Sequence, residues 1–484
     1  MSKTATWYIN CAVSLALMIF VRFIPAPEPM TQLGMTVVGI FIGAIYGWCT
    51  TNMIWPSIFA LGMLAFTTGT PMPQIWGQLM SNGVVGIAFW LMLAVGFLSN
   101  TGLTEWIAQW SMTREFTKGK PWLLMTVIFL CAIVCASMLS EVAVTLLFWG
   151  LVWSMCEEVG VKKASKTAAW ACFTVAALIS FGGYMMPFKM AVVSNFGFLA
   201  AGSNGAYDGS YSYGAWLVFT CTLVVIVFVV WMLFSRFVLK INLEKFACRE
   251  CSSADVTPLD RRQKICLALF GILFLLLMAP SFIPKGTALA GIVNTFNTVG
   301  FAMVVVAIGC MIKIDGEPLL VFSDLASKNV IWNIIFMFGT ALLLSATINS
   351  PDAGVTALLK QVIVANMGGF PPIVFVIVFL LIGAAVTNVI NNAVVGAILI
   401  PVSFSLCMAF EINPVALAAC MILFADFGIL LPSSSPTGAL LHNNSGWIPR
   451  TTVFRYGFVM LTIMIVSAFV VGWPMANILF PFSA

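Results

Sequence analysis

Apolar segments of about 20 residues recur from one end of the chain to the other, and a helix of that length spans the hydrocarbon core of a bilayer. Short polar or charged stretches separate these segments. We therefore predict an all-α polytopic membrane protein with no soluble domain of its own. The predicted helical segments are 8–25, 32–49, 53–68, 83–102, 121–156, 165–201, 213–237, 265–283, 288–311, 330–349, 371–409, 414–441 and 452–474.

Segments 121–156 and 371–409 are too long to be single membrane-spanning helices. As one helix, residues 121–156 would extend about 54 Å, which a tilted span does not accommodate. Both flanks of this segment are basic, with Lys118 before it and Lys162 after it, and basic flanks favour the cytoplasmic side. We therefore predict that both segments are re-entrant hairpins, which enter and leave the membrane on one side.

The distribution of basic residues sets the predicted orientation. With two hairpins, eleven helices cross the membrane, the N-terminus is cytoplasmic and the C-terminus lies outside. Nearly all lysines and arginines then fall on the cytoplasmic side, as the positive-inside rule expects. The exceptions are Arg22, Lys285 and Lys360, which fall outside, and Lys189, which falls within the membrane. The first helix has no small-residue cleavage pattern, so we expect it to be retained.

The two halves of the chain share three landmarks in the same order. The segments GLTEWIAQW and GVTALLKQV both have the apolar spacing of an amphipathic helix lying in the membrane interface. The hairpin centres, Glu141 and Asn392, and the Phe-Gly pairs beginning at Phe181 and Phe427 recur at a spacing of about 250 residues. Each unit has an odd number of passes, so the second copy is inverted. Inverted repeats with broken helices are typical of secondary transporters.

This repeat divides the chain into five parts. They are a leading helix (1–31), repeat 1 (32–237, with hairpin 121–156 and broken helix 165–201), a cytoplasmic linker (238–264), repeat 2 (265–474, with hairpin 371–409 and broken helix 414–441) and a C-terminal tail (475–484).

Composition excludes several other classes of protein. With 61% hydrophobic and 8% charged residues, the chain is too apolar for a soluble or nucleic-acid-binding protein. Most of the 13 cysteines lie in apolar runs, where cysteine behaves as a small hydrophobe. Cys248 and Cys251 form one Cys-x-x-Cys without the second pair that a zinc site needs. The sequence has no His/Cys/Asp cluster, nucleotide loop or paired nucleophile and base, so we expect neither an enzyme nor a resident cofactor or metal.

Four stretches interrupt the apolar helices in two matched pairs. They are the hairpin tips MLSEVA and TNVINNAV, and the breaks FGGYMMPFKMA and FGILLPSSSPTGA. A single proline or glycine more often marks an ordinary kink. Unwound backbone at membrane depth, however, is tolerated only where it is buried in protein or lines a wet cavity. We therefore predict that the four stretches meet at a shared site near the midplane.

Glu141, Lys189 and Asp426 are the ionisable residues at membrane depth in this topology, which makes them functional candidates. Three interpretations of the first two remain open: a structural ion pair, a Lys189 ammonium that stands in for a bound cation, or a Glu141 carboxyl that carries a coupling proton. Asp426 is either a cation ligand or a helix cap. His442 is expected at the interface and not in a proton relay.

The half-helices at these breaks favour an anionic ligand, because helix N-termini carry free N–H groups and partial positive charge. Carbonyl ends of half-helices bind cations as well. The expected substrate-binding residues are Ser140, Asn391, Asn392, Ser433, Ser434, Ser435 and Thr437.

The stretches NNAVVGAILIPV, LLPSSSPTGALLHN and GGYMMPFKMAVV resemble the second hairpin and the two unwound loops of the divalent anion/sodium symporter family. This family comprises the dicarboxylate, citrate and sulfate carriers of the solute carrier 13 type, and the resemblance extends over nearly the whole chain. It implies a homodimer in which a transport domain of hairpins and broken helices moves as an elevator against a scaffold.

The family has Ser-Asn-Thr at each hairpin tip, where it binds sodium and substrate carboxylate. The matching positions here read Ser-Glu-Val from Ser140 and Asn-Asn-Ala from Asn391, so that only Ser140 and Asn392 match. The resemblance therefore implies an altered first sodium site, where Glu141 replaces asparagine and Lys189 enters the loop. An ammonium there makes this site sodium-independent, as in an exchanger. Na⁺ remains the expected coupling ion at the second tip.

Asn388, beside the second tip, completes the predicted ion-coupling residues, which are Glu141, Lys189, Asp426 and Asn388.

We predict a secondary carrier of a small anion, such as a di- or tricarboxylate, that works by symport or exchange in a bacterial inner membrane. The alternative is a cation/proton antiporter on the same scaffold, with Glu141 and Asp426 as ion ligands. An ion channel fits the broken-helix symmetry less well.

Overall fold

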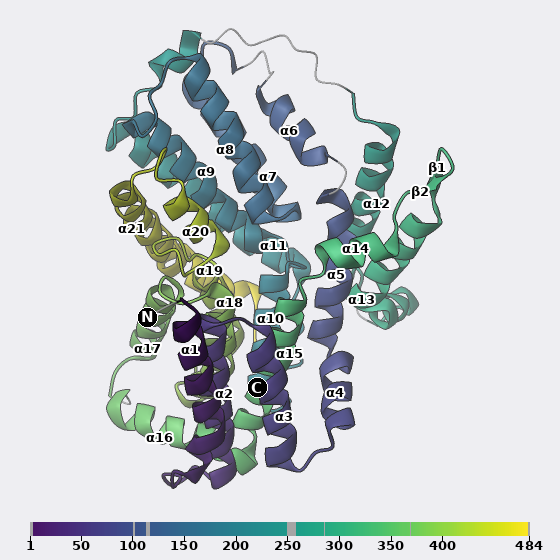
Figure 1. The fold of residues 1–484 in the computed structure, drawn as a ribbon, viewed down its shortest axis with the longest axis vertical. Coiled ribbons are helices and arrows are strands. Elements are labelled where there is room, and N and C mark those ends of the chain that lie inside the picture. Colours follow the sequence, from purple (N-terminus) through teal and green to yellow (C-terminus); the bar gives the residue numbers. More distant parts are fainter. Residues whose placement is uncertain are drawn as a thin grey trace.

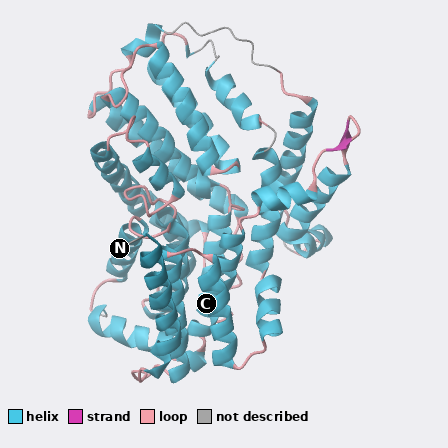
Figure 2. Ribbon diagram, viewed as in Figure 1, coloured by secondary structure: helices cyan, strands magenta, loops and turns pink. Residues whose placement is uncertain are grey.

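The computed structural model describes residues 3–99, 102–112, 117–248, 258–284, 286–367 and 369–482. Arg114, Lys285, Cys251 and the linker residues 249–257 lie outside the described residues, so the predictions that concern them stay predictions. Almost all regular structure in the described ranges is helical, which confirms the predicted all-α class (Figure 2).

The N-terminal part of the fold forms six helices. They are α1 (Lys3–Phe20), α2 (Gln32–Thr50), α3 (Ile54–Thr68), α4 (Met72–Ser81), α5 (Gly83–Ser99) and α6 (Leu103–Met112). The sequence did not predict α4, which is short and begins at a proline-containing first turn. It meets α5 at a bend of 55°, where the Asn82 side chain accepts a hydrogen bond from the Val84 N–H at 2.9 Å.

The predicted first hairpin and first broken helix occupy the next part of the chain. Its helices are α7 (Pro121–Met138), α8 (Glu141–Glu158), α9 (Lys166–Met185), α10 (Met190–Gly202) and α11 (Tyr213–Phe237). Helices α7 and α8 lie side by side, and both pack against α9 (Figure 1). The chain is interrupted at residues 139–140 and again at residues 186–189, next to Pro187.

The second half begins after the linker turn η3 (Glu244–Cys248). Its elements are α12 (Arg261–Met278), α13 (Ala288–Met311), β1 (Lys313–Ile314), β2 (Glu317–Pro318), α14 (Phe322–Asn329), α15 (Trp332–Asn349), α16 (Val355–Met367), α17 (Pro372–Thr387), α18 (Asn392–Ala409), α19 (Pro414–Ala425), α20 (Pro436–Asn443), α21 (Arg450–Ser467) and α22 (Trp473–Leu479). The chain is interrupted at residues 388–391 and at 426–435.

The small antiparallel hairpin of β1 and β2 was not predicted, although its signal is in the sequence. Asp315 and Gly316 form the turn, and both have positive φ, 53° and 88°. An Asp-Gly pair is a favoured two-residue hairpin turn because both positions need φ above zero. Helix α14, which follows this hairpin, was also missed, because it is short and polar.

By length and composition, nine of the described helices can cross a membrane, or ten if α4 and α5 form one bent span. The nine are Thr4–Phe23, Gln32–Thr50, Pro121–Met138, Lys166–Met185, Tyr213–Phe237, Arg261–Ser281, Trp332–Asn349, Asn392–Ala409 and Arg450–Leu479. This makes the protein polytopic, as predicted. The number of eleven crossings stays a prediction, because this criterion counts one arm of each predicted hairpin and leaves out shorter apolar helices.

The two predicted broken helices correspond to α9 with α10 and to α19 with α20, and their first halves, α9 and α19, lie in the centre of the molecule. Every residue of α19 is buried, and α9 is buried from Ala168 to Tyr184. A helix that is apolar on all sides and buried on all sides belongs in a protein interior and not against lipid. Helix α20 packs against α8 and α9, whereas α10 packs against α18 and α19. Each half of the chain therefore reaches across to the predicted hairpin of the other half.

Basic loops from distant parts of the chain gather at one end of the molecule. The Lys245 ammonium donates to the Gly160 carbonyl at 3.0 Å, which joins the linker to the loop after α8. The Lys163 ammonium lies 5.1 Å from the centre of the Trp447 ring, in the loop before α21. These contacts place three predicted cytoplasmic loops together.

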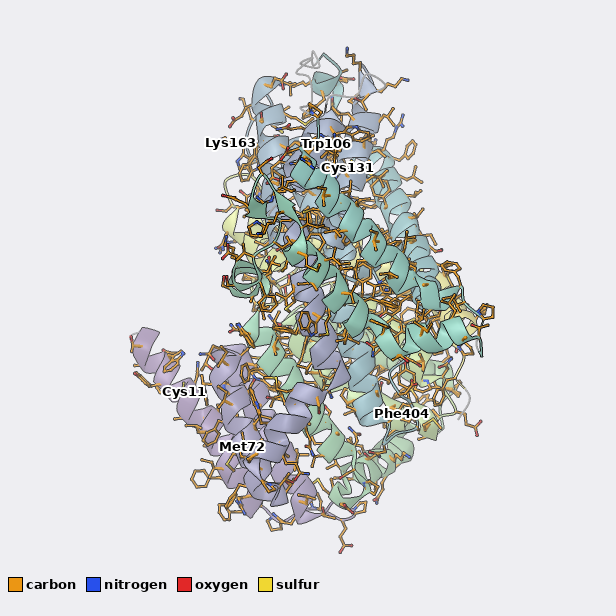
Figure 3. All side chains as sticks on the ribbon, turned by 90° about the vertical axis from the view of Figure 1, so that its right-hand side faces the viewer. Cys11, Met72, Trp106, Cys131, Lys163 and Phe404 are labelled. Carbon is orange, nitrogen blue, oxygen red and sulfur yellow. The ribbon has the colours of Figure 1, made fainter. Side chains whose placement is uncertain are left out.

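The two predicted amphipathic helices lie at opposite ends of the long axis. In Figure 1, α6 is near the top and α16 near the bottom. Figure 3 shows Lys163 and Trp106 of α6 toward the same upper end, whereas Met72 lies toward the lower end. Opposite positions are what an inverted pair of units predicts for equivalent helices.

Candidate functional site

The second hairpin tip is tied to the second break by one buried amide. Asn388 Oδ1 accepts hydrogen bonds from the backbone N–H groups of Ile429 at 3.1 Å and Leu430 at 3.0 Å. Its Nδ2 donates to the Ala384 carbonyl at 2.8 Å. Buried backbone N–H groups in an unwound segment need such partners. In this conformation, the side-chain oxygen of Asn388 is committed to holding the loop.

Asn392, the first residue of α18, makes a second link between the tip and the break. Its backbone N–H donates to the Ser434 carbonyl at 3.0 Å, and its Oδ1 accepts a hydrogen bond from the Thr387 hydroxyl at 2.9 Å. A Cβ at Gly428 would overlap Asn392 Oδ1. The second tip therefore approaches the unwound backbone so closely that only glycine fits at position 428.

The serines of the second break differ in accessibility. Ser433 is exposed, and its hydroxyl donates to the Val389 carbonyl at 2.8 Å. Ser435 is buried at the N-cap of α20, where it donates to the Gly428 carbonyl at 2.5 Å and accepts from the Gly438 N–H at 2.9 Å. Among the predicted substrate-binding serines of this loop, Ser433 is thus the one whose side chain a ligand can reach directly.

The remaining substrate candidates of the second half are Ser434, Thr437 and Asn391. Ser434 is buried and donates to the Leu431 carbonyl at 2.5 Å, and Thr437 is fully buried. Asn391 is half-buried and caps α18 through the N–H of Ala393 at 3.0 Å. Ser434 and Thr437 therefore shape the site from behind, while Asn391 lies closer to its surface.

At the first tip, Glu141 is pressed against the glycine pair at the end of α9. A Cβ at Gly183 would overlap Glu141 Oε1. The buried Thr437 hydroxyl of α20 lies beside the same carboxylate and forms no hydrogen bond with another described residue. The Glu141 side chain is half-buried, and Ser140 before it is exposed. The first tip is thus enclosed by elements from both halves of the chain.

Lys189 lies beside this tip but does not form a contact ion pair with Glu141. Its ammonium donates to the Leu139 carbonyl at 3.0 Å. Among the described residues, no carboxylate oxygen lies within 4.0 Å of Lys189 Nζ. The structure therefore does not form the direct Glu141–Lys189 ion pair, which was one of the three interpretations of these charges.

Asp426 ends α19 and brings a second carboxylate to the centre. Its backbone N–H donates to the Ile422 carbonyl at 3.2 Å, while its buried Oδ2 has no hydrogen-bond partner among the described residues. The carboxyl lies near enough to Glu141 for two carboxylates to repel each other. Because a carboxylate at a helix C-terminus faces partial negative charge, the side chain of Asp426 does not stabilise its own helix.

His442 was expected at the membrane interface, and its depth in a membrane stays a prediction. The side chain is buried in α20, with Nε2 2.8 Å from the Leu430 carbonyl and its ring 5.5 Å from that of Phe454. It ties α20 to the unwound segment. The residues next to His442 in the sequence do not indicate that its ring packs against the carbonyl of Leu430, twelve residues earlier.

The first break is held by three residues that the sequence did not single out. The indole of Trp216 donates to the Tyr184 carbonyl at 2.9 Å, and the Thr220 hydroxyl donates to the Met185 carbonyl at 3.0 Å. Tyr211 donates to the Pro187 carbonyl at 2.5 Å. Together these donors, from α11 and the loop before it, satisfy the carbonyls that α9 leaves free.

Four helix N-termini, those of α8, α10, α18 and α20, are thereby linked around one centre. Glu141 opens α8 beside Thr437 of α20, and Asn392 opens α18 against Ser434. Lys189 occupies the N-cap position of α10, and its side chain reaches the tip that precedes α8. Within the described residues, no cluster of three or more His, Cys, Asp or Glu side chains is placed to hold a metal ion. The site thus consists of hydroxyl, amide and backbone groups around the charged side chains of Glu141, Lys189 and Asp426.

Comparison with known proteins gives partial matches in sequence. Sodium-dependent low-affinity dicarboxylate transporter 1 of Caenorhabditis elegans is 27% identical over 130 residues, which is 26% of this chain and 21% of the relative. An uncharacterized transporter of Haemophilus influenzae is 25% identical over 149 residues, or 30% of this chain and 31% of the relative. The chain thus matches less than a third of the length of either relative.

The crystal structure of the YdaH transporter of Alcanivorax borkumensis has a similar fold. It matches with a TM-score of 0.59 over 99% of both chains, at 16% sequence identity. In sequence, the family model of the sodium:sulfate symporter transmembrane region matches residues 203–480. The family and the structural neighbour are transporters and not enzymes. Because the family model matches more than half of the chain, the protein belongs to the sodium:sulfate symporter family, which confirms its resemblance to the divalent anion/sodium symporters.

Proposed function

We propose that the protein is a secondary carrier of a small divalent oxyanion, either a dicarboxylate or sulfate. The observation that carries this proposal is the linkage of the N-termini of α8, α10, α18 and α20 around one centre. Helix N-termini offer partial positive charge and free N–H groups, which suit the oxygens of a carboxylate or sulfate. The C. elegans relative is a dicarboxylate transporter by name, and the family is that of sodium:sulfate symporters.

The two N-termini from the first half favour this ligand most directly. Neither Ser140 at the start of α8 nor Lys189 at the start of α10 makes a side-chain capping hydrogen bond. In contrast, Asn391 and Ser435 cap α18 and α20 through their own side chains. The first-turn N–H groups of α8 and α10 therefore have more hydrogen-bonding capacity to offer a ligand. Ser140 is exposed, so its hydroxyl is available to the same ligand.

The proposal also includes the coupling ion and the way in which the carrier moves. Na⁺ is coupled at the second tip, where Asn391 is half-buried and Ser433 is exposed. Repeats 32–237 and 265–474 are related by inversion, and their hairpins and broken helices move together as an elevator within a homodimer. The reciprocal packing of α20 on α8 and of α10 on α18 supports this arrangement. The membrane is a bacterial inner membrane, with the N-terminus on the cytoplasmic side.

Uptake into proteoliposomes tests the proposal. Radiolabelled succinate, citrate and sulfate are offered under imposed gradients of sodium, protons or counter-substrate. We expect uptake of at least one divalent anion, reduced several-fold by Ser140→Ala. The matched control Ser327→Ala removes an exposed hydroxyl from α14 and should leave uptake unchanged.

A second candidate is a cation/proton antiporter that uses Asp426 and Glu141, and it is favoured by the buried Asp426 oxygen that finds no partner in the described part of the chain. If the proteoliposomes exchange sodium for protons and move no anion, the anion carrier is excluded and this candidate is supported.

A further inference from the structure

The ammonium of Lys189 lies at a position that suits a cation. It donates to the carbonyl of Leu139, the C-cap residue that directly follows α7. The last carbonyls of a helix lack partners within the helix and carry partial negative charge. Carbonyl ends of interrupted helices are the groups that coordinate coupling cations in secondary transporters. The ammonium at this tip therefore takes up an oxygen that a bound ion would otherwise use.

The backbone around Lys189 fixes this placement. Its N–H donates to the Met186 carbonyl at 3.1 Å, and its own carbonyl accepts from the N–H groups of Val192 and Val193, both at 3.0 Å. The residue is half-buried and forms the N-cap of α10. The side chain thus begins from a rigid point and reaches across the break to the hairpin tip.

The equivalent positions of the second half are neutral. The N-cap of α20 is Ser435, whose hydroxyl donates to a backbone carbonyl at 2.5 Å. The tip residue that matches Glu141 is Asn392, whose amide accepts from Thr387 at 2.9 Å. The first half therefore carries one negative and one positive side chain where the second half carries none. The Glu141 carboxylate balances the charge that Lys189 brings.

Together these observations disagree with a sodium ion at the first tip. A second cation there would lie next to a fixed ammonium and would compete with it for the Leu139 carbonyl. Two carboxylates lie near this tip, Glu141 and, at the end of α19, Asp426, but the Leu139 carbonyl is already taken by Lys189, so a sodium ion would have to displace the ammonium from it. The neutral second tip has no built-in cation of this kind.

We propose that the Lys189 ammonium is a tethered cation that permanently occupies the cation position of the first hairpin tip, so that this tip binds no external coupling ion. The inference rests on the proposed anion transport and specifies its coupling: external sodium acts at the second tip alone. Removing the ammonium should create a vacancy that a small soluble cation can fill.

Chemical rescue in proteoliposomes tests this inference. Lys189→Ala should lose at least tenfold of its anion uptake at low sodium and should regain several-fold with methylammonium. Tetramethylammonium, which cannot donate hydrogen bonds to the carbonyl, should not restore uptake. In the unaltered protein, methylammonium should have no effect and the sodium dependence should have a Hill coefficient near one. Lys189→Ala should show a steeper dependence, because sodium also enters the vacated position.

The matched control is Lys166→Ala, which removes an ammonium that donates to the Leu239 carbonyl away from the site. Its uptake and sodium dependence should match those of the unaltered protein. If Lys189→Ala keeps the original sodium dependence and ignores methylammonium, the tethered-cation proposal is wrong. Absence of anion uptake by the unaltered protein would instead contradict the proposed function.

A binding measurement separates these two failures, because it does not require transport. In detergent, methylammonium should raise the melting temperature of Lys189→Ala by several degrees and leave that of the unaltered protein unchanged. If Lys189→Ala does not fold, Lys189→Ser takes its place, because serine is a favoured N-cap residue and leaves the same vacancy, and it should show the same gain. Equal shifts for the variant and the unaltered protein would overturn the inference.

Discussion

The rings of Phe181 and Phe427 stack face to face, with centroids 4.8 Å apart and planes inclined by 11°. Each phenylalanine precedes a glycine, and these are the two Phe-Gly pairs that recur at equivalent positions of the two halves. Phe181 belongs to the last turns of α9, and Phe427 directly follows α19. Contact between equivalent residues is expected where two related units meet at a pseudo-two-fold axis.

The aromatic stack should stabilise the fold through a coupling between its two rings. Phe181→Ala and Phe427→Ala should each cost about 3–5 kcal/mol of apparent unfolding free energy, because both rings are buried. The double variant should cost less than the sum by about 0.5–1.5 kcal/mol, the worth of an aromatic pair. Thermal unfolding in detergent measures both effects. Phe282→Ala, a ring that is 79% exposed, is the control and should change little.

A side chain added at Gly183 should displace the first tip. The Cβ of Gly183→Ala would overlap the Glu141 carboxylate, and we expect loss of most anion uptake with a folded, monodisperse protein. Gly150→Ala is the matched control on α8, because nothing lies within 4 Å of the added Cβ. Anion uptake into proteoliposomes that contain the purified variants measures this difference between Gly183→Ala and Gly150→Ala. Full activity of Gly183→Ala would show that the tip moves aside freely.

Asn388 should stabilise the unwound segment of the second break through the hydrogen bonds that its side chain accepts. Asn388→Ala leaves two buried N–H groups, of Ile429 and Leu430, without an acceptor, and should destabilise the protein by about 1–3 kcal/mol. Asn388→Asp keeps an acceptor for both N–H groups but places a buried carboxylate oxygen against the Ala384 carbonyl, so it should also be less stable than the original protein. Melting temperatures measure the difference. The control Asn443→Ala alters an exposed residue of α20 and should leave the melting temperature nearly unchanged. If it lowers the melting temperature as much as Asn388→Ala does, the hydrogen bonds of Asn388 have no special effect.

The predicted membrane topology has a direct test by cysteine labelling. Lys118→Cys and Lys163→Cys flank the first hairpin, and both should react with an impermeant maleimide from the cytoplasmic side. Lys360→Cys on α16 should react from the opposite side. Intact and inverted vesicles give the two accessibilities. Labelling of positions 118 and 163 from different sides would exclude a re-entrant hairpin and with it the inverted repeat.

The sequence by itself determined where helices form and where they stop. Apolar runs of bilayer length predict membrane helices whatever their neighbours, and proline and glycine interrupt a helix through local geometry. Thus α9 ends two residues before Pro187, and α20 begins at Pro436 after a long break. Among the elements that were missed, α4, α14 and the β1–β2 hairpin are too short or too polar for a pattern based on apolar length.

Only the tertiary structure decided which partner each polar group takes. Lys189 bonds to the Leu139 carbonyl and not to Glu141, and Asn388 holds backbone N–H groups about 40 residues away in the chain. His442 is buried against a carbonyl of the break. Such choices depend on which unpaired backbone groups the packed helices bring within reach. Spacing along a single sequence does not encode that geometry, whereas side-chain hydrophobicity and backbone stiffness act locally.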